Sequence, residues 1–212
     1  MTHDRERHKG EAKMRAFHNN QELKDATLAQ LAKHAEADEI IRGTGWDGHK
    51  GCAIGCLLHE YDHSLLPERL GWPQWFGRVV DALHENVSGN KKWSGGTWVQ
   101  TVTEAVPVGL TERDFKTKVE APFLVMVLES TLDMFDHKQF PDVKSAIDGS
   151  IALWQRNDIG SGEWNKAARA AVQAAEEAEE AARAAARAAG AEKYDYFADG
   201  LLDILASLQG DV

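Results

Sequence analysis

The stretch APFLVMVLESTLDMF, residues 121–135, decides the fold class that this 212-residue sequence predicts. It is apolar almost all round and longer than ten residues, which favours a buried helix over a strand. We expect the helix to begin at Pro122, because proline is tolerated in the first turn of a helix. It should be the least solvent-accessible helix of the protein, with Phe123, Met126 and Leu128 mostly buried.

Apolar residues at helical spacing continue on both sides of this stretch, and each run has a start or stop signal. No segment alternates apolar and polar residues between hairpin turns, so no sheet is expected. The sequence therefore predicts an all-α fold, a multi-helix domain of orthogonal or bundle-like architecture. The signals are Asn20 as the N-cap of a helix that Gly43 ends, Pro73 and Pro141 at first helical positions, and the capping-box pair Thr111 and Asp114.

The composition changes abruptly after residue 160. Residues 166–191 are mostly alanine with interspersed Glu and Arg, which predicts a long helix that Gly190 or Gly200 breaks. Such a helix has little apolar bulk, so it is either a spacer or a surface for close helix packing, in cis or between copies. We divide the chain into a flexible polar tail (1–16), a helical domain (17–160), and an alanine-rich helix plus a short C-terminal helix packed on the body or on a partner (161–212).

The charge and the cysteine content exclude several classes of protein. A formal net charge of −10 argues against nucleic-acid binding and against docking on anionic membranes. No signal peptide and no apolar run of ~20 residues are present, so we expect neither secretion nor a membrane span. Cys52 and Cys56 are too close along a helix for an unstrained disulfide, and two reduced thiols fit a cytoplasmic protein.

The segment GTGWDGHKGCAIGCLLHEYDH, residues 43–63, differs chemically from the rest of the chain. It holds five glycines, both cysteines and three of the nine histidines. Its first six residues match the dinucleotide motif GxGxxG, but they follow a predicted helix instead of a strand, so a nucleotide-binding fold is rejected. Backbone N–H groups before a helix start suggest an anion site, and the alternative is a flexible connector. The candidate ligand-binding residues are Trp46, Asp47, Lys50, Gly51 and Cys52.

HEYDH at the end of this segment matches the metalloprotease motif HExxH. In that motif His59 and His63 would bind zinc from one helix face, and Glu60 would act as the general base. A third ligand is needed, and Glu85, His84 or His49 are the candidates. We favour no metal cofactor, with zinc at His59 and His63 as the alternative.

A helix from about Cys52 to His63 would place Cys52, Cys56, His59 and His63 on one face. The four cannot bind a single ion, because eleven residues of helix span about 16 Å. The alternative is a packed face, with small cysteine side chains allowing close approach.

Cys52 is also a candidate nucleophile. It would lie in the first helical turn beside His49 and Lys50, an environment that lowers a thiol pKa. A nearby histidine would then serve as its base. The catalytic candidates are therefore Cys52 and Glu60.

The segments HKGCAIGC (49–56), LLHEYDHS and FDHKQFPDVKSAI (135–147), together with the alanine-rich tail, resemble an uncharacterised family encoded in bacteriophages, prophages and bacterial genomes. Some members with an alanine-rich tail are labelled immunity proteins. The resemblance implies a phage-like or mobile-element setting, in which small acidic proteins often bind and inhibit other components. It implies no fold, activity or site residue.

Two functions follow as expectations. The first is a non-enzymatic binding or inhibitory protein that acts through the loop and helix at residues 43–63, on a protein partner or a small anionic ligand. The second is a small hydrolase that depends on Cys52 or on zinc at HEYDH.

Overall fold

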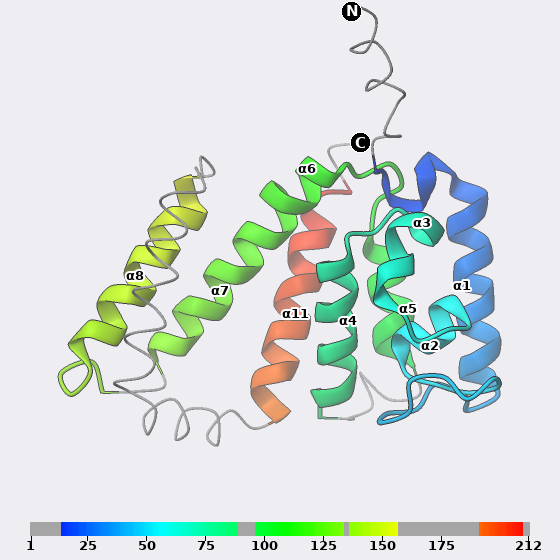
Figure 1. Cartoon of the computed structure of the whole chain (residues 1–212), viewed down its shortest axis with the longest axis horizontal. Coiled ribbons are helices and arrows are strands. Elements are labelled where there is room, and N and C mark those ends of the chain that lie inside the picture. The colour runs from blue at the N-terminus through cyan, green and yellow to red at the C-terminus, as the bar shows by residue number, and fades with distance from the viewer. Residues whose placement is uncertain (1–13, 89–95, 134–135, 157–190, 210–212) are drawn as a thin grey trace, which may run out of the picture.

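Figure 1 shows the computed structural model of the chain, which describes residues 14–88, 96–133, 136–156 and 191–209. These residues form helices packed against one another without a strand, as predicted for an all-α fold. The expectations for the alanine-rich stretch up to Gly190 lie outside the described residues, as do those for residues 1–13. Ala16, assigned to the polar tail, is fully buried.

The described helices follow the predicted order. The N-cap Asn20, the capping box of Thr111 with Asp114 and the start at Pro141 are confirmed, whereas Pro73 is the N-cap of α4 instead of its first helical residue. The elements are η1 (Ala16–Asn19), α1 (Gln21–Glu36), α2 (Ala53–Leu58), η2 (His63–Leu65), α3 (Leu66–Leu70), α4 (Gln74–Asn86), α5 (Thr97–Ala105), α6 (Glu112–Asp114), the π-helical turn η3 (Phe115–Glu120), α7 (Ala121–Leu132), α8 (Pro141–Arg156) and α11 (Ala191–Ser207).

The helices lie side by side, with α8 and α7 at one end of the molecule, α1 at the other, and α4, α5, α2 and α3 nearer to α1 (Figure 1). Fully buried aromatic rings pack edge to face in the core, with Trp72 in contact with both Phe17 and Phe76. Such contacts add to the free energy of burying the rings themselves. These ring contacts therefore hold η1 against the start of α4.

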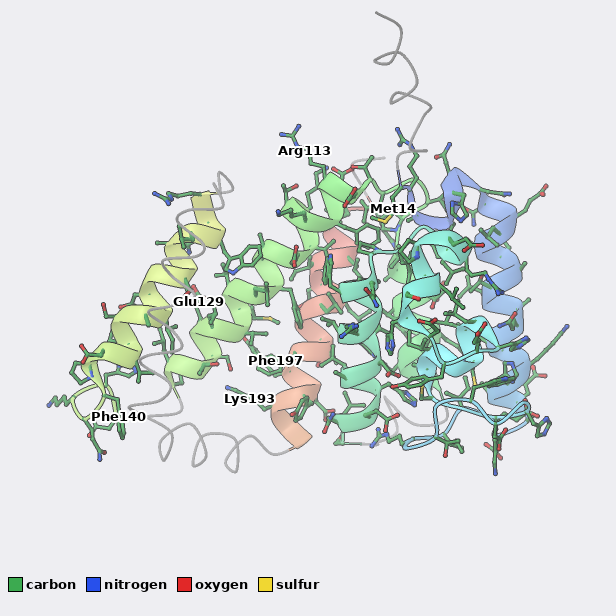
Figure 2. The ribbon with its side chains drawn as sticks, in the orientation of Figure 1. Met14, Arg113, Glu129, Phe140, Lys193 and Phe197 are labelled. Atoms are coloured by element: carbon green, nitrogen blue, oxygen red, sulfur yellow. The ribbon has the colours of Figure 1, made fainter. Side chains whose placement is uncertain are left out.

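The C-terminal helix α11 lies between α7 and α4 (Figure 1). Ala198, Leu201 and Leu205 are fully buried, and Phe197 lies between α11 and α7 (Figure 2). Gly200 does not break this helix, contrary to one of the predicted break points. A side chain there would lie 2.2 Å from the sulfur of Met126, so the glycine allows α7 to pack closely.

The prediction that residues 122–135 form the least accessible helix is wrong. Phe123 is buried, but Met126 and Leu128 are only partly buried, and Met134 lies outside the described residues. All six residues of α2 are buried, because α2 packs between α1 and α4. Helix α7 contacts α11, α8 and η3, and most of its residues are only partly buried.

Pro122 does not begin a separate helix. The chain stays helical from Glu112 through α7, and the π-helical turn Phe115–Glu120 comes directly before the proline-containing turn. A π-turn inserts one residue into the hydrogen-bond ladder, so it accommodates a proline that lacks the N–H group.

Helix α1 ends at Glu36 instead of at Gly43. After it the chain runs beside Gly51, whose N–H donates to the carbonyl of Glu39 at 3.0 Å and whose carbonyl accepts from Ile41 at 2.8 Å. These bonds bring the end of α1 against the segment of residues 43–63.

Candidate functional site

The glycine-rich loop before α2 uses its own backbone groups. The Cys52 N–H donates to the carbonyl of Thr44 at 2.7 Å, and the Asp47 carboxylate accepts from the N–H groups of His49 and Lys50 at 3.0 and 2.9 Å. These two hydrogen bonds hold the pKa of Asp47 below its ordinary value. The N–H groups of His49, Lys50 and Cys52, which lie before the helix start, are therefore already bonded within the loop.

Two glycines of the loop and helix have a packing role. The carbonyl oxygen of Gly45 lies 2.3 Å from the position of a Cβ atom on Gly51 and 1.9 Å from that on Gly55. Any larger residue at either position would collide with the backbone. These glycines therefore allow a close backbone approach, and the group that approaches is the chain's own Gly45.

The helix predicted from Cys52 to His63 is shorter than expected. Helix α2 ends at Leu58, because His59 adopts the left-handed conformation with φ 53°. The predicted face of four sulfur and imidazole groups does not form, and HEYDH does not lie on one helix. His59 and His63 turn to different partners, His34 and Asp81.

His59 joins a chain of hydrogen-bonded side chains at the end of α1. The Nδ1 atom of His34 lies 2.6 Å from one oxygen of Glu39, and its Nε2 atom lies 2.8 Å from Nε2 of His59. The other oxygen of Glu39 lies 2.9 Å from Nε2 of His49. The indole of Trp46 stacks on His59 with ring centroids 5.1 Å apart. The sequence did not indicate His34 or Glu39 as site residues.

Three members of this hydrogen-bonded group, His34, Glu39 and His59, line an open hollow of about 510 Å³. His34 is buried, whereas His59 and Lys33 are exposed. Gln30 is held by hydrogen bonds from its amide to the carbonyls at the end of α2. The hollow is lined by Ala26, Ala29, Gln30, Lys33, His34, Glu39 and His59.

The surroundings of His59 favour its neutral form. Although His59 is largely exposed, partial desolvation of its ring lowers its pKa, and the nearby His34 lowers the pKa further. One of the two Nε2 atoms must carry a proton that the other accepts, so the pair shares a proton at the wall of the hollow. His59 also has a positive φ of 53°. In a non-glycine residue this conformation costs free energy, and it is common at functional sites.

The prediction that Cys52 is an activated nucleophile is wrong. Cys52 is 2% exposed, and burial, together with the carboxylate of Asp81, raises the pKa of its thiol to about 12. Backbone N–H groups at the start of α2 lower the pKa only in part. Burial likewise raises the pKa of Cys56 to about 11. Both thiols are therefore protonated at neutral pH.

The remaining predicted site residues are dispersed. Lys50 is exposed and Gly51 is buried, and neither lines the hollow. Glu60, the predicted general base, is half exposed and lies 3.9 Å from Arg69. Of the predicted residues, His59 and Trp46 lie together beside the hollow, whereas His63 lies next to Asp81.

Comparison of the chain with protein-family models, curated proteins and solved structures finds no match. Within the described ranges, none of the helices combines the length and the apolar composition that crossing a bilayer requires.

Proposed function

We propose that the chain is a non-enzymatic binding protein that takes a small anionic ligand in the hollow beside His34 and His59. The observation that carries this proposal is the pair of imidazole Nε2 atoms, 2.8 Å apart, at the wall of that hollow. Such a pair can take up one further proton and so become a cation when an anion arrives. In this proposal the residue of segment 43–63 that contacts the ligand is His59, near the end of the segment, instead of the residues of its glycine-rich start.

The charges around the hollow favour an anion over a cation. Glu39 is the one carboxylate that lines it, and both of its oxygens already lie within 3 Å of histidine nitrogens. Lys33 supplies an exposed ammonium group on the same wall. A carboxylate or phosphate would therefore meet Lys33 and His59, whereas a basic group would find no unengaged carboxylate among the lining residues.

The geometry gives the hydrolase reading less support. A cysteine hydrolase needs a reachable thiolate, and Cys52 is buried and protonated. A zincin needs two histidines one turn apart on a helix, and His59 ends α2 in a left-handed conformation. In the phage-like setting that the family resemblance suggests, a binding role without catalysis is the remaining proposal.

Imidazole NMR signals of the full chain, titrated with inorganic phosphate and with acetate, test the proposal. We expect the signals of His34 and His59 to shift together and to saturate. The signal of His18 should stay in place, because its ring is bonded to the Glu68 carbonyl, away from the hollow. Linear, non-saturating shifts, or equal shifts of all three histidines, would show that the hollow is not an anion site.

A further inference from the structure

A second group of metal-ligating side chains lies between the start of α2 and one face of α4. The sulfur of Cys52 and one carboxylate oxygen from each of Asp81 and Glu85 lie within 4.8 Å of one another. Asp81 and Glu85 are four residues apart, so they share one face of α4. Cys52 is the residue directly before α2.

Two buried polar atoms at this group lack a hydrogen-bond partner. Asp81 is 6% exposed, and its Oδ1 atom has none. The Nε2 atom of His63 is also buried and lies 3.3 Å from the Oδ2 atom of Asp81, but the two are not aligned as a hydrogen bond. Buried polar atoms without partners cost free energy, so the unpartnered oxygen of Asp81 indicates a ligand at the group of Cys52, Asp81 and Glu85.

The outer partners of the carboxylates fit the same interpretation. The hydroxyl of Tyr61 donates to Oδ2 of Asp81 at 3.0 Å, and the N–H of Gly43 donates to Oε2 of Glu85 at 2.8 Å. Each carboxylate thus has one oxygen held by an outer donor, and the second oxygen of Asp81 is buried without a partner. Carboxylates that bind metals are commonly oriented in this way.

We propose that Cys52, Asp81 and Glu85 bind one zinc ion. A sulfur and two carboxylate oxygens are ligands that zinc accepts, and a water molecule completes a four-coordinate site. Binding breaks the S–H bond of Cys52, forms a sulfur–zinc bond and releases the proton to solvent. The two charges of zinc then offset two of the three negative charges of the thiolate and the carboxylates.

Cys52 and Asp81 are buried, so the ion fixes the start of α2 to one face of α4. The start of segment 43–63 is held on the same face, because the N–H of Gly43 is bonded to Glu85. The zinc site shares no ligand with the hollow at His34 and His59, so it goes beyond the anion-binding proposal and can fail or hold independently of it.

Cobalt binding to the untagged, chelator-treated full chain tests the site, because Co²⁺ takes the place of zinc and reports thiolate ligation by absorption. We expect one Co²⁺ per chain, a thiolate-to-cobalt charge-transfer band, and loss of that band when Zn²⁺ is added. Cys52→Ala should abolish the band. Cys56→Ala is the matched control, since Cys56 is equally buried and its thiol faces the carbonyl of Gly51.

Glu85→Gln keeps the proposal testable if Cys52→Ala does not fold, because Glu85 is only partly buried. It should keep the charge-transfer band and weaken the affinity for Co²⁺ by at least about tenfold. Absence of any band at stoichiometric Co²⁺, a band that survives Cys52→Ala, or an affinity unchanged in Glu85→Gln would overturn the proposal.

Discussion

The carbonyl oxygen of Gly45 occupies almost the place that a side chain on Gly55 would need, 1.9 Å from an ideal Cβ position. The loop is thereby pressed onto the buried helix α2, and the Cys52 N–H is bonded to the loop carbonyl of Thr44. This contact fixes where α2 begins and therefore the position of His59, which follows the last residue of α2. It also explains Gly51 and Gly55 without a ligand.

Gly55→Ala should lower the free energy of unfolding by about 1–3 kcal/mol, because the added methyl group collides with backbone that cannot rotate away. Gly149→Ala is the matched control. Gly149 lies within α8 with nothing within 4 Å of its Cβ position, so alanine should stabilise the protein by about 0.5–1 kcal/mol. Urea denaturation of both variants measures the two effects. Equal effects of the two substitutions would contradict the close contact.

Both thiols should be unreactive in the folded protein at pH 7.5. Burial raises the pKa of Cys52 to about 12 and that of Cys56 to about 11, so neither forms a thiolate at that pH. A colorimetric disulfide reagent, applied after chelator treatment, should count no thiol in buffer and two in urea. Rapid reaction of one thiol in the folded state would restore the cysteine-nucleophile interpretation.

Stability should fall as the pH drops below about 6.5. Desolvation is the main cause that lowers the pKa values of His59 and His84 below the 6.5 of an unfolded histidine. Below that pH the unfolded state binds these protons more readily than the folded state, so acid favours unfolding. Their contribution is complete above pH 6.5 and is lost as the pH falls through the lowered values. The urea midpoint at pH 5.5 should lie below that at pH 7.5, and a higher midpoint at pH 5.5 would contradict this account.

Thr111→Ala should cost about 1 kcal/mol of stability, because it removes the cap of the helix that continues into α7. The Thr111 side chain accepts from the Asp114 N–H at 3.1 Å, and the Asp114 carboxylate accepts from the Thr111 N–H at 3.1 Å. Thr117→Ala, in the same helical run, should change stability by less than about 0.5 kcal/mol. A thermal melt that ranks the two variants in the opposite order would show that the cap does not limit stability.

Helix starts could be predicted because their signals are local. The side chain of Asn20 accepts from the two N–H groups that follow it, and Pro73 and Pro141 fit helix starts whatever surrounds them. Helix ends and burial depend on contacts distant in sequence. The left-handed turn at His59 comes with its ring placed against His34 and Trp46, and neither contact has a signature in the sequence.

The candidate site was predicted only in part for the same reason. Segment 43–63 was identified from composition, but His34 lies 25 residues before its partner His59, and single-sequence patterns do not reveal such pairs. Asp81 and Glu85 did carry a usable signal. Their spacing of four residues within the apolar stripe of α4 indicates two carboxylates on one helix face.

The most direct measurement of the central claim compares phosphate affinity in Lys33→Gln and Lys50→Gln. Both variants remove one exposed lysine, but only Lys33 lines the hollow with His34 and His59. We predict that Lys33→Gln weakens phosphate binding by about five- to tenfold, the loss of one charge at close range, and that Lys50→Gln leaves it unchanged. Weakening by Lys50→Gln alone would place the anion at the glycine-rich loop, and wild-type protein that binds no phosphate would contradict the proposed function outright.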